Sequence, residues 1–244
     1  MEISSRVLGQ EHLSTLNSIG NLAYTLYSQG RLNEAEVLEV HVMETAKRVL
    51  GQEYHYTLII MGNLAVTYLK QERLKQVGEL EMQVMETRKR VLGEEHPHTL
   101  TSMGTLASTY RSQGRWKEAE VLEVHVLETF RRVLGQEHPS TIACISNLAS
   151  TYREQGRWMK AGELFLQVIE TREKVLGQYH LDTLTSMGNR AATYLKQERW
   201  KDAKELFVPV METRKKIVGQ KHPSTFHHGE PRNDVPGPGA MEGC

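Results

Sequence analysis

Histidine is the residue type in this sequence whose spacing most suggests a chemical site. Five of the 11 histidines recur at one position of a 42-residue period, namely His12, His96, His138, His180 and His222. Imidazole nitrogens bind Zn²⁺ at about 2.0–2.1 Å, whereas residues repeated once per helical unit stand at least one packing distance, about 8–10 Å, apart. These histidines cannot share a metal ion, so we predict a role in loops and no metal site.

Neither cysteine gives a catalytic centre. Cys144 and Cys244 are the only cysteines, and Cys144 occupies a position that holds Ser18, Ser102 or Ser186 in other periods. The sequence contains no Gly-x-Gly-x-x-Gly, no P-loop and no His-Glu-x-x-His motif. Two cysteines cannot make a disulfide framework, and the opening residues lack the apolar stretch of a secretory signal. We predict a cytoplasmic protein that is not an enzyme and uses no cofactor.

Runs of basic residues could indicate a nucleic-acid site, and they occur at Arg88–Arg90, Arg131–Arg132 and Arg214–Lys216. Each run has a glutamate four residues before one of its bases, which is the favourable order for an ion pair on a helix. Thirty bases balance 30 acids, so no long-range field attracts nucleic acid or an anionic membrane. No apolar run reaches the ~18 residues of a membrane span. We predict neither a nucleic-acid nor a membrane partner.

These residues are positioned by an internal repeat. A glycine recurs every 42 residues, at Gly9, Gly51, Gly93, Gly135, Gly177 and Gly219. We predict five repeats within residues 10–226, at 10–51, 52–93, 94–135, 136–177 and 178–219, followed by an incomplete sixth over 220–226. Residues 1–9 are predicted to end a preceding repeat, and residues 227–244, rich in proline and glycine, to form a disordered tail.

Two helices are predicted in each repeat, because the apolar residues follow a helical spacing. In the third repeat the first helix carries Leu100, Met103, Leu106, Ala107 and Tyr110, and the second carries Trp116, Ala119, Leu122, Val126, Val133 and Leu134. Gly30, Gly114 and Gly156 follow the first helix, where a left-handed residue is favoured. Pro139 precedes it, and Ser140–Thr141 can cap its N-terminus. Each repeat is therefore a helical hairpin.

A single hairpin cannot bury both apolar faces, so the hairpins must stack. Glycine inside a helix costs ~1 kcal/mol relative to alanine, and a recurring glycine predicts close approach of a neighbouring helix at Gly20, Gly62, Gly104 and Gly188. Pro209 lies deep in the last second helix, where it removes a hydrogen bond. We predict a kink or a weakly ordered turn near Glu205–Pro209.

The fourth repeat carries the fullest motif: HPST at 138–141, NLASTY at 147–152, QGRW at 155–158, Ala161, LF at 164–165 and VLG at 175–177. With these residues the chain resembles tetratricopeptide repeats of the 42-residue kinesin light chain type, over about residues 3–226. The resemblance implies an all-α, right-handed solenoid of stacked helical hairpins. The first helices would line its concave side and bind other proteins.

Two sets of glutamates depart from the family pattern. Glu72 and Glu198 replace the turn glycine, and Glu39, Glu81 and Glu123 stand where the family often has an aromatic residue. Val77 also replaces a small Ala at the helix crossing and Arg190 a core Leu, so the second and fifth repeats are predicted to be looser than the fourth.

Two functions follow from the resemblance, and both stay open. The first is a scaffold that holds a partner protein or peptide in the concave groove, as kinesin light chains hold cargo adaptors. The second is the ligand-sensing arm, or a fragment, of a larger nucleotide-binding signalling receptor. Residues 102–116 are similar to the repeats of fungal receptors of that kind.

The predicted peptide-binding residues lie on the first helices and comprise Asn21, Asn63, Lys70, Arg111, Asn147, Arg153, Asn189 and Lys196. A side-chain amide both donates to and accepts from a peptide backbone, and the cations favour an acidic ligand. The alternative is that each Asn caps or bridges neighbouring helices. Because the terminal repeats have no neighbour to cover their apolar faces, we also predict self-association through uncapped ends.

Overall fold

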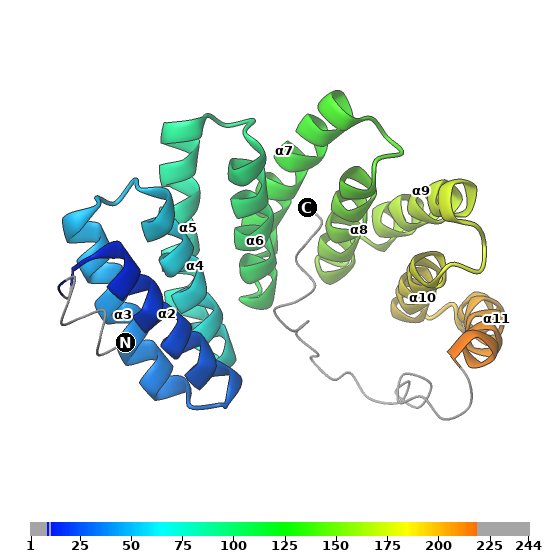
Figure 1. Ribbon diagram of the computed structural model, residues 1–244. Coiled ribbons are helices and arrows are strands. Elements are labelled where there is room, and N and C mark those ends of the chain that lie inside the picture. The colour runs from blue at the N-terminus through cyan, green and yellow to red at the C-terminus, as the bar shows by residue number, and fades with distance from the viewer. Residues whose placement is uncertain (1–8, 10, 219–244) are drawn as a thin grey trace. The chain divides into compact units, whose positions relative to one another are not determined.

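The computed structural model describes residue 9 and residues 11–218. All the regular elements in this part are α-helices, α2 to α11, which confirms the predicted all-α class (Figure 1). Apart from Gly9, the end of a preceding repeat predicted at 1–9 lies outside the described residues. The incomplete sixth repeat at 220–226 and the disordered tail at 227–244 also lie outside them.

The chain divides into two compact units, Met1–Arg115 and Trp116–Cys244. The first unit contains α2 (Leu13–Ser28), α3 (Leu32–Val49), α4 (His55–Lys70), α5 (Leu74–Leu92) and α6 (Pro97–Ser112). The second contains α7 (Trp116–Leu134), α8 (Pro139–Glu154), α9 (Trp158–Leu176), α10 (Leu181–Lys196) and α11 (Trp200–Val218). Within each unit every helix packs against the next one in the sequence. Stacked hairpins are therefore confirmed in each unit.

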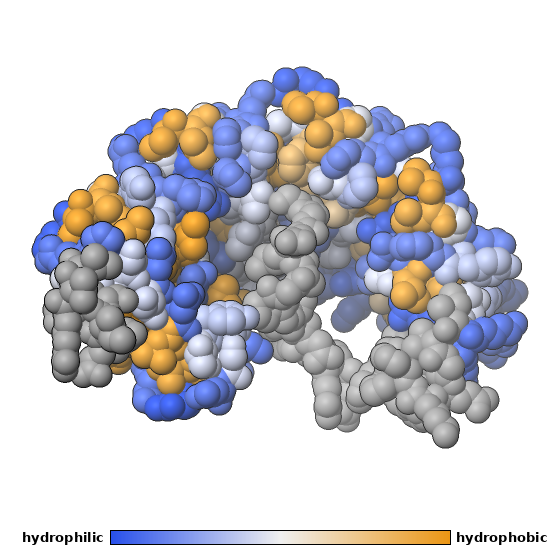
Figure 2. All heavy atoms as spheres, in the orientation of Figure 1, coloured by the Kyte–Doolittle hydropathy of each residue, from blue (hydrophilic) through white to orange (hydrophobic). Residues whose placement is uncertain are grey.

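The core joins one repeat to the next. In the first unit Leu16, Val42 and Ile60, from α2, α3 and α4, form one buried cluster. In the second unit Phe165 of α9 is fully buried against Ala149 of α8. Burying an aliphatic or aromatic side chain of this size contributes about 1.5–3 kcal/mol. Polar residues cover much of the visible surface, and the apolar patches on it are separate (Figure 2).

Histidine begins most of the first helices. The Nδ1 of His138 accepts a hydrogen bond from the Ser140 backbone N–H at 3.2 Å, and His12, His96 and His180 accept the equivalent bond at 3.1–3.2 Å. Pro139 follows as the first helical residue. The predicted loop role is confirmed, but the cap is histidine and not the Ser140–Thr141 pair, because those residues already lie inside the first turn.

A left-handed residue closes each described first helix. Gly30, Gly114 and Gly156 have φ between 73° and 77°. Glu72 and Glu198 adopt nearly the same conformation, with φ of 61° and 59°. The turn is therefore kept where glycine is absent, at a cost of about 1–2 kcal/mol for an L-residue.

Pro209 does not interrupt its helix. Helix α11 runs from Trp200 to Val218 with Pro209 inside it. The predicted weakly ordered turn at Glu205–Pro209 is therefore wrong, and the kink predicted as the other outcome stays a prediction.

On the second helices, glutamates stand at positions where the family often has an aromatic residue. Glu39 and Glu123 are 6% and 5% exposed, and Phe165 fills the equivalent position in α9. Burial raises the pKa of Glu39. Burial raises the pKa of Glu81 to about 7, opposed by a threonine, Thr109. These glutamates therefore weaken the stack when they ionise.

Substituting glycine for Glu72 or Glu198 should stabilise the protein. We expect the free energy of unfolding to rise by about 1 kcal/mol for each change, because glycine adopts positive φ without strain but has more freedom in the unfolded chain. Urea denaturation followed by circular dichroism measures the effect. Lys75→Gly, at an exposed position of α5, is the control and should lose about 1 kcal/mol. A loss of stability in Glu72→Gly would contradict the strain.

The stability of the first unit should fall as pH rises through the ionisation of Glu81. The folded carboxyl, with a pKa of about 7, holds its proton between about pH 4.5 and 7, whereas the unfolded carboxyl has lost it. The folded state binds more protons in this window, so stability decreases with rising pH. Glu81→Gln should therefore be more stable than the parent by on the order of 2–3 kcal/mol at pH 8, and nearly equal to it at pH 4.5.

The matched control is Glu79→Gln, which removes an exposed carboxylate from the same helix. We expect its stability to follow the parent at every pH in urea denaturation. Equal gains from the two substitutions would show that loss of negative charge, and not burial, causes the effect.

Candidate functional site

The predicted binding residues all lie on first helices. In the first unit Asn21 is on α2, Asn63 and Lys70 are on α4, and Arg111 is on α6. In the second unit Asn147 and Arg153 are on α8, and Asn189 and Lys196 are on α10. Arg111, Arg153 and Asn189 are half-buried, and the other five are exposed. Within each unit the predicted residues therefore lie on the first helices of consecutive repeats.

Three of the asparagines have side chains that are not used by the fold. In the part of the chain that the structure describes, the amides of Asn21, Asn63 and Asn189 make no side-chain hydrogen bond. The hydroxyls of Thr25 and Thr193 donate to the backbone carbonyls of Asn21 and Asn189, and the side-chain amides take no part in these bonds. The alternative that these three bridge neighbouring helices is therefore not supported. Their amides remain available to a ligand.

The glycines beside these asparagines do not mark close helix packing. A Cβ on Gly62, Gly104 or Gly188 would meet nothing within 4 Å, and one on Gly20 would make only ordinary contacts at 3.9 Å. The predicted approach of a neighbouring helix is therefore wrong. No neighbouring side chain lies within 4 Å of a Cβ built at Gly62, Gly104 or Gly188, so the glycine leaves open backbone next to Asn63 and Asn189.

The cations of the site differ in their partners. The Nε–H of Arg153 donates to Glu154 at 3.1 Å, and its guanidinium lies 6.0 Å from the centre of the Phe165 ring. Lys70 and Lys196 are exposed at the ends of α4 and α10. The first helices together hold five bases, Lys70, Arg111, Arg153, Arg190 and Lys196, against two acids, Glu154 and Asp182. This helix set is net positive although the chain is neutral.

Two arginines near the ends of second helices, Arg88 of a basic run and Arg172, have structural roles. Arg88 is half-buried, and its Nη1 donates to Ser102 Oγ at 2.8 Å and to the His98 carbonyl at 3.3 Å. Burial lowers the pKa of Arg88. Arg172 makes the same pair of bonds, to Ser186 Oγ at 2.7 Å and the Asp182 carbonyl at 2.9 Å. These arginines join a second helix to the next first helix.

Sequence reasoning missed a polar cluster at the first turn of the second helices. The Glu36 carboxylate accepts from Arg73 Nη1 at 2.7 and 2.8 Å and from Gln71 Nε2 at 3.0 Å. The Arg73 guanidinium lies 4.2 Å above the Tyr68 ring. Burial opposes ionisation of Glu36, but these hydrogen bonds outweigh it and the pKa is lowered. The recurring Gln-x-Arg of the hairpin turns was the signal in the sequence.

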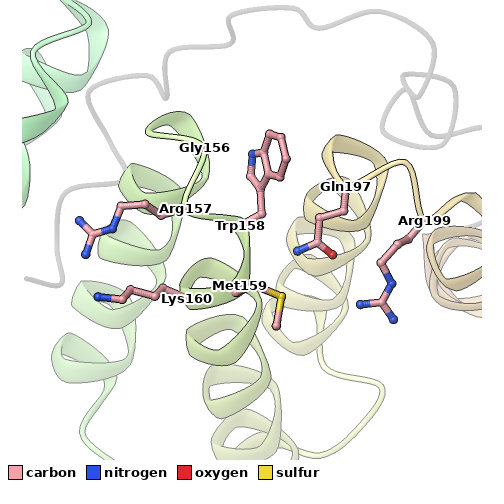
Figure 3. Close-up of a pocket in the computed structure, with 7 residues that line it drawn as sticks. All are labelled: Gly156, Arg157, Trp158, Met159, Lys160, Gln197 and Arg199. Carbon is pink, nitrogen blue, oxygen red and sulfur yellow. The ribbon is translucent and has the colours of Figure 1, made fainter.

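The same cluster recurs in the second unit. Glu120 accepts from Arg157 Nη1 at 2.6 Å and from Gln155 Nε2 at 2.8 Å, and Arg157 lies 4.0 Å above the Tyr152 ring. Beside it is a cavity of about 450 Å³ between the start of α9 and the turn after α10 (Figure 3). Its lining residues are Gly156, Arg157, Trp158, Met159, Lys160, Gln197 and Arg199.

Among the described residues, no group of His, Cys, Asp and Glu could hold a metal ion. Cys144 carries a buried, reduced thiol. None of the helices in the described part is long and apolar enough to cross a membrane.

Family models for the tetratricopeptide repeat match residues 15–53, 57–98, 99–140 and 141–216. No curated protein sequence gives a significant match.

Solved structures of the same architecture resemble the chain. The putative kinesin light chain with nearly identical TPR-like repeats from Podosopora anserina is 30% identical, covers 86% of this chain and 99% of its own, and has a TM-score of 0.75. BtubC (BKLC) from P. vanneervenii is 19% identical over 96% of this chain and 90% of its own, with a TM-score of 0.71. YrrB, a TPR protein with an unusual peptide-binding site, is 14% identical over 87% and 91%, with a TM-score of 0.54.

Proposed function

Because the chain belongs to the tetratricopeptide repeat family, we propose that it is a protein-interaction scaffold in which the first helices of each compact unit bind an extended, acidic segment of a partner protein. The observation that carries the proposal is the set of free amides on Asn21, Asn63 and Asn189. A surface amide without an internal partner can donate to one peptide carbonyl and accept from one peptide N–H.

Open glycine beside the amides supports recognition of a backbone. A residue without a Cβ lets another polypeptide come close to the helix, and Gly62 and Gly188 directly precede Asn63 and Asn189. A ligand held through its backbone can vary in sequence. The scaffold would therefore accept a class of segments rather than one sequence.

Charge supports the acidic character of the ligand. The first helices have three more bases than acids, five against two. Contacts at the exposed Lys70 and Lys196 would mainly speed association, and half-buried Arg111 would contribute more to affinity, since desolvated charge pairs are stronger.

The resemblance to a putative kinesin light chain favours a role in holding a partner such as a cargo adaptor, and YrrB is described as having a peptide-binding site. The second candidate, the sensing arm of a nucleotide-binding receptor, stays a prediction. Self-association through the ends stays a prediction as well. No catalytic family is among the matches, which accords with a scaffold.

A phage-displayed library of random peptides, selected on the full chain, tests the proposal. We expect the selected peptides to be enriched in Asp and Glu. Arg111→Glu should weaken the binding of these peptides by about 1–3 kcal/mol for a desolvated contact. Asn63→Ala should weaken their binding to a similar or smaller degree, and fluorescence anisotropy measures both affinities.

Two controls separate the surface from general effects. Lys75→Glu changes the charge of an exposed residue on α5 and should leave affinity unchanged. Gly62→Ala should be tolerated, whereas Gly62→Phe should block the peptide without unfolding the protein, because the added ring points into open space. Selection of neutral peptides that ignore Asn63, Gly62 and Arg111 would refute the proposed surface.

A further inference from the structure

The four contacts between consecutive repeats do not all carry the same polar cluster. Glu36 and Glu120, on α3 and α7, are bound by the Gln and Arg of the next hairpin turn. The equivalent residues of α5 and α9, 42 positions further on in each case, are Gly78 and Gly162. At two contacts the carboxylate is therefore missing, although the Gln and Arg that bind it remain.

At the first of these contacts another side chain fills the space. A Cβ on Gly78 would lie 3.0 Å from Gln113 Nε2. That Nε2 donates to the Leu74 carbonyl at 2.6 Å, and Gln113 Oε1 accepts from Arg115 Nη1 at 3.2 Å. The amide of Gln113 therefore has partners on both sides, and no room is left beside Gly78.

At the second contact the space stays open. A Cβ on Gly162 would meet nothing within 4 Å. The Oε1 of Gln197 is buried and has no hydrogen-bond partner among the described residues. The Arg199 Nε–H donates to Asp202 of its own helix at 2.7 Å. The absence of a carboxylate at the place held by Glu36 and Glu120 accounts for the open space. The unpartnered amide oxygen of Gln197 corresponds to the atom that accepts from the arginine Nη1 in the two complete clusters.

Arg199 is already in the position from which the equivalent arginines bind. Its guanidinium lies 4.3 Å above the Tyr194 ring, compared with 4.2 Å for Arg73 and 4.0 Å for Arg157 over their tyrosines. In the two complete clusters the arginine Nη1 bonds both the carboxylate and the Gln Oε1. A carboxylate arriving beside Gly162 would accept from Gln197 Nε2 and from Arg199 Nη1, and the same Nη1 would then donate to Gln197 Oε1, as in the complete clusters.

The cavity gives such a carboxylate an approach and an apolar wall. Met159 points from α9 toward α10, and Gln197 points from the end of α10 toward α9, whereas Arg157 and Lys160 point to the other side of α9 (Figure 3). Gly162 lies one turn further along α9, on the face of Met159. Met159 is 70% exposed and Trp158 39% exposed. An acidic side chain flanked by apolar residues fits both the polar part of the lining, Gln197 and Arg199, and the apolar part, Met159 and Trp158.

We propose that the cavity at the start of α9 binds a Glu or Asp side chain of a partner polypeptide, held by Arg199 and Gln197 in the place that Glu36 and Glu120 occupy at other repeats. The flanking apolar residues of the partner contact Met159 and Trp158. This site is separate from the surface formed by the first helices, and neither proposal depends on the other.

Titration of the ¹⁵N-labelled full chain with the blocked peptide acetyl-Leu-Glu-Leu-amide tests the site. We expect saturable shifts of the Gln197 side-chain amide, the Arg199 Nε–H and the Trp158 indole N–H. The matched peptide acetyl-Leu-Gln-Leu-amide should bind at least about tenfold more weakly. Equal binding of the two peptides, or absence of these shifts, would overturn the proposal.

A pair of glycine substitutions is the matched control. Gly162→Glu supplies the missing carboxylate from the chain itself, so it should abolish peptide binding and raise the thermal midpoint. Gly78→Glu puts the same residue where Gln113 fills the space, and it should leave peptide binding unchanged. Peptide binding that survives Gly162→Glu in the folded protein would overturn the proposal.

Two further measurements complete the test. Arg199→Gln should weaken binding of the glutamate peptide by about tenfold and leave the affinity for ligands of the first helices unchanged. Failure of one proposed site is therefore distinguishable from failure of the other. Succinate should compete only weakly. If it competed as well as the peptide, the site would take free carboxylates and the polypeptide occupant would be wrong.

Discussion

The contact between the second helix of one repeat and the first helix of the next is the constraint on which the structure depends. A hairpin of two amphipathic helices leaves one apolar face in water, and only a following hairpin covers it. The Leu16, Val42 and Ile60 cluster shows this directly, because its members come from three consecutive helices of two repeats.

This contact is built in two ways with one backbone geometry. Arg88 on Ser102 and Arg172 on Ser186 give a polar version. At the alternate contacts the equivalent positions hold buried apolar residues, Ala46 with Ile60 and Phe130 with Cys144. The glutamates at 36 and 120 and the glycines at 78 and 162 follow the same alternation. Each second helix therefore faces a first helix whose side chain matches its own in polarity, and this consistency favours the native order of repeats over a shifted one.

Stability and binding use different faces of the same helices. The buried face of each first helix carries the apolar residues and a threonine, while the side chains of Asn21, Asn63 and Asn189 lie outside the core and make no internal hydrogen bond. Substitution at these positions is therefore expected to leave the fold intact, which is what a scaffold with interchangeable ligands needs. Buried Glu39, Glu81 and Glu123 are the opposite case, because they lie at a repeat contact and penalise it when charged.

The sequence by itself determined what depends on neighbours along the chain. The spacing of apolar residues predicted the helices, and Gly30, Gly114 and Gly156 predicted where the first helices end. These signals act within one or two helical turns. The candidate residues on the first helices followed from the same helical spacing. Only the tertiary structure decided features that depend on a side chain about 35–40 residues away in the next repeat. The open space beside Gly62, the raised pKa of Glu81 and the unpartnered oxygen of Gln197 are such features. Their physical cause is burial and contact across a stack, which residue type and spacing do not encode.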